Sequence, residues 1–484
     1  MSPLIVAFAV YLLAVVVIGV VASRRLDSQS EFLLGGRQLP GWAIAISERA
    51  SGESAWLLLG LTGAALSTGL GEIWTVLGCV AGILFLWFFL GRRVRALCDG
   101  SDALTLPELL AQRLGAGGNG LRWLATLIIV FFFSFYVAAQ MVGAGKILQK
   151  TGIITEAWPQ LFGAGPETWG IVLGALIVVG YTLLGGFRAV VWTDLLQGVI
   201  MIVALVVLPV VGFVALGREH GDVTAALAAL GPTKSSWTAG RGGWGALSLV
   251  LGGLAWGLGY MGQPHLLVRF MALRSAGEVR QLRWLAGAWT LLAYGGAFLV
   301  GLLALGLYGG AHFAGDAEKV MPSMAALLLP GWLAGIVISG AVAAMMSTAD
   351  SQLLVVTSAF SEDVSRRILG RRLSPRGEVA LSRLVVLLVG GAAFALALAS
   401  QETVYGMVSY AWSGLGASFG PVVLLLLLWP RFGPRGAAAA MLAGTLATIL
   451  WKNVGPLDAA ISHRFAAWVI ALLAGLALNG RGRR

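Results

Sequence analysis

A cluster of charged and hydroxyl side chains lies inside one of the apolar stretches of this 484-residue chain. The stretch runs from about Trp42 to Leu66, and its middle, Ser47–Ser54, reads SERASGES. Each charge at a bilayer centre costs about 2.5–3.5 kcal/mol on insertion scales, so such a cluster requires a compensating role. Polar, glycine-containing backbone at that depth is tolerated where it is buried in protein or lines a wet cavity. We predict a broken helix whose carbonyl and hydroxyl oxygens bind a cation; the alternative is a helix whose polar face is satisfied by neighbours.

A second apolar stretch carries a further set of oxygen ligands. The string GAVAAMMSTADSQLL (340–354) supplies the hydroxyls of Ser347, Thr348 and Ser351 and the carboxylate of Asp350. Ser347 shares a helical face with Asp350 and Ser351, which follow it by three and four residues. Small hard cations prefer such oxygens. Hydroxyls in membrane helices also bond back to the i−4 carbonyl, which explains the serines and the threonine but not Asp350.

A third stretch has the composition of another interrupted helix. Residues 252–265 read GGLAWGLGYMGQPH. Glycine costs about 1 kcal/mol and proline about 3 kcal/mol in a helix interior, so this run should unwind or kink. Trp256 and Tyr260 are four residues apart and share one face, either as ligand-binding aromatics or as ordinary core or interface aromatics. Two such interrupted spans in corresponding halves of a chain indicate an inverted-repeat secondary transporter with a site at the bilayer midplane.

The composition agrees with many membrane-spanning helices around these segments. Hydrophobic residues make up 58% of the chain and charged residues 11%. A span needs about 20 apolar residues. We predict thirteen spans in one membrane domain: Leu4–Val21, then approximately 42–66, 73–91, 121–146, 168–186, 191–215, 243–268, 283–308, 327–360, 378–399, 404–429, 435–452 and 463–479. The longest polar intervals, at about 216–242 and 361–377, are expected to be loops or short surface helices.

The positive charge of the chain, +11, is explained by topology. Arginine pairs such as Arg24-Arg25, Arg92-Arg93 and Arg366-Arg367 all fall on the same predicted side of the membrane, in every second connection, and the opposite side holds few basic residues. The positive-inside rule then places the N-terminus outside and the C-terminus in the cytoplasm. We therefore interpret the basic charge as a topology signal and expect no nucleic-acid partner.

Strings along the chain resemble the sodium/solute symporter family, most closely its bacterial sodium/proline symporter branch. The matching strings are LLGGRQLPGW (33–42), SAWLLLGLTGA (54–64), DALTLPELL (102–110), YTLLGGFRAVVWTDLLQ (181–197), WGLGYMGQPHLLVRFMA (256–272), MSTADSQLLV (346–355) and VSYAWSGLGASFGPVVLL (408–425). The resemblance implies an all-α polytopic membrane protein with a LeuT-type core of two inverted five-helix repeats. That core covers about residues 40–430, preceded by an extra helix (1–30) and followed by two C-terminal helices (435–484).

The resemblance also assigns candidate site residues. The family's sodium site falls on the backbone carbonyls of Ala50, Glu53 and Ala344 and on the hydroxyls of Ser347 and Thr348. Its substrate pocket falls on Ser54, Trp56, Tyr136, Trp256, Tyr260 and Pro264. A second sodium site present in some relatives falls on Asp194, Ser347, Asp350 and Ser351.

Several residues depart from the proline branch at the coupling machinery. The branch carries Asp where this chain has Gly52, and small residues where it has Glu48 and Arg49; many relatives have Ser at position 350. One hypothesis is that Glu48, Glu53 or Asp350 replaces the missing carboxylate. A second is that Arg49 pairs with Asp350 or Asp194, its guanidinium standing in for a second cation. Asp194 also has a simpler interpretation, as a residue near a helix N-terminus stabilised by the macrodipole.

The resemblance implies alternating-access import of a small amino acid, with L-proline the expected solute and Na⁺ the coupling ion, in the bacterial inner membrane. The alternatives are a proton-coupled or ion-independent transporter of another small amino acid or carboxylate, a channel, or a solute sensor. We expect no enzymatic activity, because the four histidines are scattered without a metal or nucleophile constellation. The expected partners are the solute and membrane lipid, with no obligatory protein partner.

Overall fold

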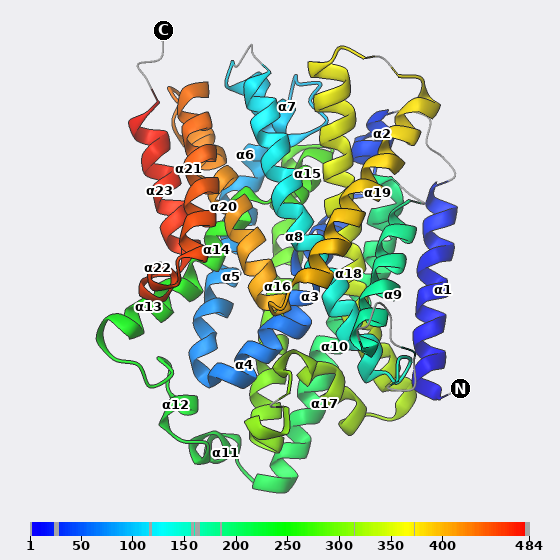
Figure 1. Cartoon of the computed structure of the whole chain (residues 1–484), viewed down its shortest axis with the longest axis vertical. Helices are drawn as coiled ribbons and strands as arrows, with labels where there is room; N and C mark the ends of the chain where they lie inside the picture. The colour runs from blue at the N-terminus through cyan, green and yellow to red at the C-terminus, as the bar shows by residue number, and fades with distance from the viewer. Residues whose placement is uncertain are drawn as a thin grey trace.

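The computed structural model of the chain describes residues 2–23, 29–115, 119–155, 159, 165–183, 186–313, 315–371 and 373–479. Long helices run side by side through the molecule, and shorter helices and turns join them at its two ends (Figure 1). Nine stretches of this described chain are long and apolar enough to cross a membrane. One of them, Gly41–Ala96, contains two passes, because the chain turns back at the short helix η3 (Gly69–Glu72).

The described helices make thirteen passes, as predicted, once the two shorter apolar helices α9 and α23 and the 20-residue helix α21 are included. The unbroken passes are α1 (Pro3–Ser23), α8 (Gly120–Lys150), α9 (Pro166–Thr182), α10 (Phe187–His220), α16 (Ala276–Tyr308), α18 (Gly331–Ser358), α19 (Pro375–Ala399), α20 (Val404–Leu428), α21 (Pro434–Asn453) and α23 (His463–Ala477). The segmented passes are α3 (Gly41–Ala55) with η2 (Trp56–Leu61) and α4 (Thr62–Thr68), α5 (Ile73–Phe85) with η4 (Leu86–Leu90) and α6 (Gly91–Ala96), and α13 (Gly243–Leu254) with α14 (Trp256–Gly259), η5 (Tyr260–Gly262) and α15 (Pro264–Ala272).

Short helices fill the connections. They are α2 (Gln29–Leu34), η1 (Gly35–Arg37), α7 (Leu106–Arg113), α11 (Val223–Ala229), α12 (Pro232–Ser235), η6 (Gly310–Phe313), η7 (Ala317–Lys319), α17 (Val320–Leu328), η8 (Ala359–Ile368) and α22 (Gly455–Ala460). The polar interval 216–242 thus contains two short helices, as predicted. The interval expected to begin at 361 is partly helical, because η8 continues the α18 pass to Ile368.

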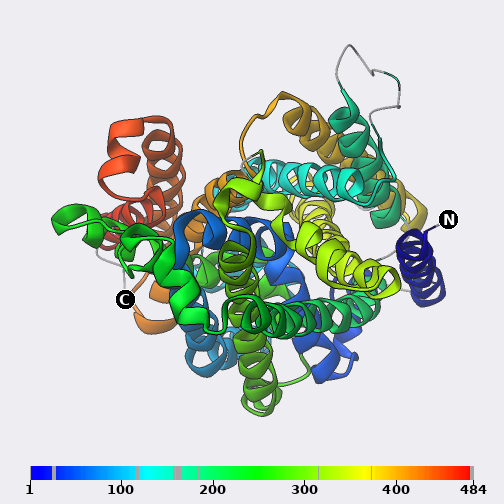
Figure 2. The same ribbon diagram turned by 90° about the horizontal axis from the view of Figure 1, so that it is seen from below.

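The first segmented pass lies at the centre of the molecule. Its helix α3 packs against α18, α10 and α16, while α8 packs against α18 and α20 against η2 of the same pass. Seen along the helices, α1 lies at one edge, against α10 and α18, and α21 and α23 lie at the opposite edge, against α20 (Figure 2). The two termini lie at opposite ends of the bundle (Figure 1), as an odd number of passes requires.

Two glycines allow the pass that contains Trp256 to approach α5 and α20 closely. A Cβ added to Gly82 of α5 would lie 2.3 Å from the carbonyl oxygen of Gly257 in α14. A Cβ on Gly259 would lie 2.0 Å from the indole nitrogen of Trp412 in α20. Small residues permit such backbone contacts between membrane helices. The pass that contains Trp256 and Tyr260 is therefore held directly against α5 and α20.

Candidate functional site

The first pass of the core is broken at Ser54, at the end of the polar cluster. Ser54 has φ 53° and ψ −173°, a conformation that residues with a side chain rarely adopt. Its hydroxyl accepts a hydrogen bond from the backbone nitrogen of Trp56 (3.2 Å), and the side-chain oxygen of Gln140 accepts one from the nitrogen of Ala55 (2.9 Å). The helical turns that follow, in η2, are wide. Gln140 supports the break from α8, a role that the sequence did not suggest.

The hydroxyls of Ser347 and Thr348 meet carbonyl oxygens of α3 just before this break. Ser347 Oγ donates to the carbonyl of Ala50 (3.1 Å) and lies 3.1 Å from that of Ala344. Thr348 Oγ1 donates to the carbonyl of Ser51 (3.0 Å). The structure therefore brings Ala50, Ala344, Ser347 and Thr348 together. The carbonyl of Glu53 instead accepts from the nitrogen of Trp56, and Ser51 takes the place beside Thr348.

Arg269 of α15 organises the second set of candidate residues. Its Nη2 lies 3.0 Å from Asp194 Oδ2 and 2.6 Å from the hydroxyls of both Ser51 and Ser351. Its Nε donates to Ser47 Oγ at 3.0 Å. Asp350 accepts a hydrogen bond from Ser351 at 3.3 Å. Asp194 lies two turns inside α10, which begins at Phe187, so its role is this ion pair rather than a helix-terminal one.

The predicted pairing of Arg49 with Asp350 or Asp194 is wrong. Arg49 binds Glu48 through two hydrogen bonds, at 2.5 and 2.6 Å, and contacts Glu53 at 3.3 Å. With 3.6 residues per turn, Arg49 and Ser51 project from nearly opposite faces of α3. Only the face that carries Ser47 and Ser51 is directed at Asp194. The arginine that does reach Asp194 was visible in the sequence, as the lone charge of the run LLVRFMA, but its partner was not.

The second break separates η5 from α15 at Gln263, which has φ −83° and ψ 110°. The helix α15 then restarts at Pro264, as proline in the first turn favours. The glycine-rich run 252–262 remains mostly helical, so the interruption is shorter than predicted and lies at the end of this run. Both breaks occur in passes that pack against α20.

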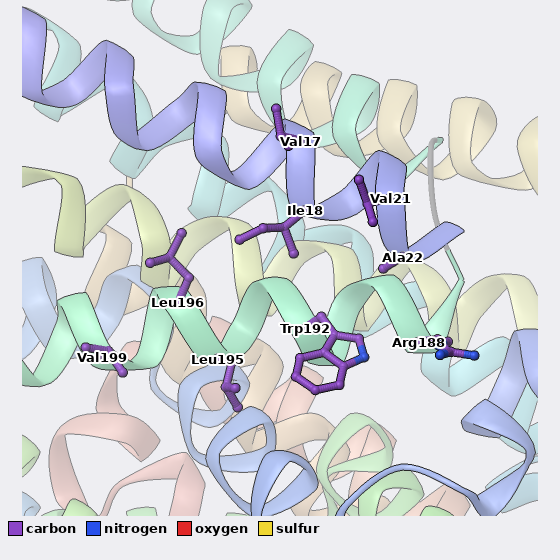
Figure 3. Close-up of a pocket in the computed structure, with 9 residues that line it drawn as sticks. All are labelled: Val17, Ile18, Val21, Ala22, Arg188, Trp192, Leu195, Leu196 and Val199. Carbon is purple, nitrogen blue, oxygen red and sulfur yellow. The ribbon is translucent and has the colours of Figure 1, made fainter. Parts of the chain in front are cut away.

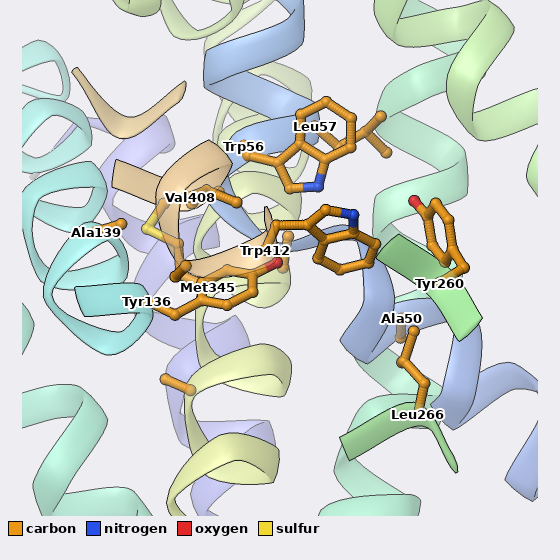
Figure 4. Close-up of a cluster of buried hydrophobic side chains, with 14 of the residues drawn as sticks. Ala50, Trp56, Leu57, Tyr136, Ala139, Tyr260, Leu266, Met345, Val408 and Trp412 are labelled. Atoms are coloured by element: carbon orange, nitrogen blue, oxygen red, sulfur yellow. The ribbon is translucent and has the colours of Figure 1, made fainter. Parts of the chain in front are cut away.

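Aromatic rings from both broken passes meet between these breaks (Figure 4). Trp56 stacks on Trp256, with ring centroids 4.4 Å apart and planes 9° from parallel. Tyr260 packs edge-on against Trp412 at 4.6 Å and hydrogen-bonds to the hydroxyl of Tyr294. Tyr136 donates to the hydroxyl of Ser54 at 3.4 Å. The five predicted pocket residues other than Pro264 therefore converge, and Trp412 and Tyr294 join them.

The outer side of this aromatic cluster is closed by residues from two further elements. The indole nitrogen of Trp256 donates to Tyr405 of α20 at 3.2 Å. The guanidinium of Arg464, at the start of α23, lies over the Trp256 ring, 5.0 Å from its centroid. Trp56, Trp256 and Tyr260 are completely buried. A solute can therefore enter only after these rings move.

A larger space than any beside these residues lies on the outer surface of the described chain. It is a groove of about 850 Å³ between α1 and α10, lined mainly by apolar side chains with Arg188 at one end (Figure 3). A much smaller space beside α15 is lined by Arg269, Ser351 and Leu104 among others. The surface groove has the character of a lipid-facing contact, whereas the buried residues described above are the candidate site.

Comparisons with known proteins agree with this architecture. The model of the "Sodium:solute symporter family" matches residues 32–444. The chain is 38% identical over 446 residues to the "High-affinity proline transporter PutP" of Bacillus subtilis, covering 91% of this chain and 90% of that one. It is 36% identical over 465 residues to the "Sodium/proline symporter" of Escherichia coli, covering 94% and 88%. A solved Na⁺-coupled sialic acid symporter, in a substrate-bound outward-open state, superposes with a TM-score of 0.76 at 18% identity, covering 99% of this chain and 98% of that one.

Proposed function

Because this chain belongs to the sodium:solute symporter family, we propose that it is a secondary active symporter that imports L-proline, or a closely similar small amino acid, together with Na⁺. The curated relatives described above are named for proline, which supports the choice of solute. The protein is not an enzyme, since the family and these relatives are transporters.

One observation carries the proposal for the ion. The hydroxyls of Ser347 and Thr348 meet the carbonyls of Ala50 and Ser51 directly before the break at Ser54. Hydroxyl and carbonyl oxygens are the donors that a hard monovalent cation accepts, and broken helices supply them at the membrane midplane. Ala50, Ala344, Ser347 and Thr348 would bind Na⁺, with the Glu53 carbonyl joining them after a local rearrangement. Asp194, Asp350 and Ser351 would form the wall beside this site.

The two halves of the site explain how ion and solute binding are coupled. Na⁺ would join the broken pass containing α3 to the unbroken helix α18, and so fix the position of Ser54 and Trp56. The solute would lie among Trp56, Tyr136, Trp256 and Tyr260, after Trp56 and Trp256 separate. Its carboxylate would meet the N-terminus of α15, beside Pro264, where the helix dipole favours an anion. Each ligand therefore stabilises the arrangement that the other requires, which is positive coupling.

The arginine distribution supports an orientation in the bacterial inner membrane. The end of the molecule that holds α2, α7 and the C-terminal end of α15 carries most of the arginines, including Arg95, Arg113 and Arg274. The positive-inside rule makes this the cytoplasmic end. The N-terminus then lies outside and the C-terminus in the cytoplasm.

The test is uptake of labelled proline into proteoliposomes that contain the purified protein. An inward Na⁺ gradient should drive accumulation, and unlabelled internal proline should produce saturable counterflow. A pH gradient without Na⁺ should not drive uptake. Uptake that depends on pH alone would establish proton coupling, and flux without counterflow would establish a channel; either result would overturn the proposal.

A further inference from the structure

A buried triad of charges lies beside the aromatic cluster, on α3. Arg49 forms a bidentate pair with Glu48, and the indole nitrogen of Trp87 donates a further hydrogen bond to Glu48 at 2.9 Å. Arg49 makes only one contact with Glu53, and this contact is longer, at 3.3 Å. A bidentate pair is the stronger of the two interactions. Glu48 therefore matches the charge of Arg49, and Glu53 is the carboxyl group of the triad without a full counter-charge.

The carboxylate of Glu53 lies among the tyrosines of the candidate solute pocket. The side chain is completely buried, and its Oε2 makes no hydrogen bond in the described part of the chain. Tyr294 lies beside the Glu53 side chain, and Tyr136 and Tyr260 are near enough to interact electrostatically with its carboxyl group. A buried carboxylate without a full partner is costly, so this position favours a ligand that brings a cation.

This cation is distinct from the coupling ion. The Ser347 and Thr348 hydroxyls approach α3 from α18, on the side where Ser51 contacts Asp194. Arg49 and Glu53 are four residues apart on the other side, toward Trp87 and Tyr294. The Glu53 carboxylate and the hydroxyls of Ser347 and Thr348 therefore lie on different sides of α3.

The aromatic rings around Glu53 suit an organic cation. Tyrosine and tryptophan faces attract ammonium groups, and a neighbouring carboxylate accepts their N–H hydrogen bonds. We propose that the side chain of Glu53 binds the protonated amine of the transported amino acid, while the ring of Tyr260 packs beside it. This assignment rests on the proposed function and makes Glu53 a specificity-determining residue: solutes with a protonated amine are carried, and isosteric solutes without one are not.

The experiment uses proline and tetrahydrofuran-2-carboxylate, in which an ether oxygen replaces the proline amine. In proteoliposomes at saturating Na⁺, both are tested as competitors of labelled proline uptake by the wild type, by Glu53→Gln and by Glu108→Gln. Glu108 is a buried glutamate of α7 at the end of the molecule that holds α2 and the C-terminal end of α15, and it serves as the matched control. We expect Glu53→Gln to raise the KM for proline about 10-fold or more, the effect of losing one charge-assisted hydrogen bond. The wild-type preference for proline over the ether should shrink by a similar factor, and the control should retain it.

The Na⁺ dependence separates this proposal from the alternative that the Glu53 carboxylate binds Na⁺. Glu53→Gln keeps the backbone carbonyl, so half-activation by Na⁺ should stay within about twofold of the wild type, below the 1.4 kcal/mol that a tenfold change represents. A raised Na⁺ requirement with unchanged discrimination between the two solutes would overturn the assignment and give the carboxylate to the ion. If Glu53→Gln does not fold, Glu53→Asp, which keeps the charge, should retain the preference for proline; its loss there counts against the assignment only if Glu108→Asp retains it.

The assignment of Glu53 can still be tested if proline is not the transported solute. If the wild type does not transport proline, other amino acids are screened for one that raises the melting temperature of the wild type. That amino acid and its analogue without the amine are then compared in the wild type and in Glu53→Gln. Loss of discrimination in the variant supports the Glu53 assignment even then. Equal discrimination by both proteins overturns it.

Discussion

Arg269 Nη2 and Asp194 Oδ2 lie 3.0 Å apart, and their side chains are 2% and 0% exposed. This ion pair joins α15 to α10, and the serines of α3 and α18 complete its hydrogen bonds. Four passes, which contain α3, α10, α15 and α18, are therefore connected through one guanidinium.

Removing one member of this pair should strongly destabilise the protein. Arg269→Gln or Asp194→Asn should each cost about 3–5 kcal/mol, because the remaining charge stays buried without its partner. The double variant should cost much less than the sum of the two. Thermal unfolding in detergent measures all four proteins, and additive losses would show that the two side chains act independently.

The hydroxyls of α18 should determine the Na⁺ requirement. Ser347→Ala and Thr348→Ala should each raise the Na⁺ concentration for half-maximal uptake about 10-fold, the effect of losing one ion ligand worth roughly 1.4 kcal/mol. Ser339→Ala is the control, since its hydroxyl bonds to the Gly335 carbonyl of the same helix at 2.7 Å. An unchanged Na⁺ requirement in both site variants would remove these hydroxyls from the ion site.

The stacked indoles should determine solute affinity. Trp256→Ala should raise the KM for proline about 10-fold, because the solute loses an aromatic face, and Trp256→Phe should have a smaller effect. Trp284→Ala is the control, as that indole is 66% exposed on α16. Uptake kinetics at saturating Na⁺ provide the measurement, and equal KM values for Trp256→Ala and the control would contradict the prediction.

The backbone at Ser54 should favour glycine over alanine. Both substitutions remove the hydroxyl that caps Trp56, but only glycine adopts φ 53° without strain. Strain of this kind costs about 1–3 kcal/mol, so Ser54→Gly should melt at a higher temperature than Ser54→Ala. The opposite order would mean that the break is not held in this conformation.

Glu108 should stabilise the end of the bundle that holds α7 in a pH-dependent manner. Burial raises the pKa of this carboxyl, but hydrogen bonds from Arg122 and Gln112 and the charge of Arg367 outweigh it, so the net pKa is lowered. Its contribution is present above the ordinary glutamate pKa of about 4.3 and is lost as the pH falls through the lowered value. Glu108→Gln should therefore cost about 1–3 kcal/mol at pH 7 and progressively less below pH 4. A melting-temperature difference that is constant from pH 7 to pH 3 would contradict this.

The sequence predicted the passes well, because span length and apolar composition depend on the bilayer rather than on tertiary contacts. It also located the polar cluster of α3 and the aromatic pair Trp256 and Tyr260. The positions of the breaks were less predictable. Ser54 is not a residue that signals positive φ, and its conformation depends on Gln140 from another helix.

The partners of buried charges could not be derived from spacing along one helix. Arg49 and Arg269 both lie near candidate carboxylates, and choosing between them for Asp194 requires the rotation of α3 about its axis and the approach of α15. The same applies to Trp412 and Tyr294, which enter the aromatic cluster from α20 and α16. Their sequence neighbourhoods are ordinary membrane helix, so only the packing identifies them.

The position of Arg464 over the Trp256 ring places the last helix, α23, beside the proposed solute pocket. Chimaeras that exchange α21–α23 between members of the family would therefore replace a residue that contacts the proposed pocket, as well as the outer helices of the bundle. The solute selectivity of such chimaeras should depend on whether they keep the contact between tryptophan and arginine, and not on where the two sequences are joined.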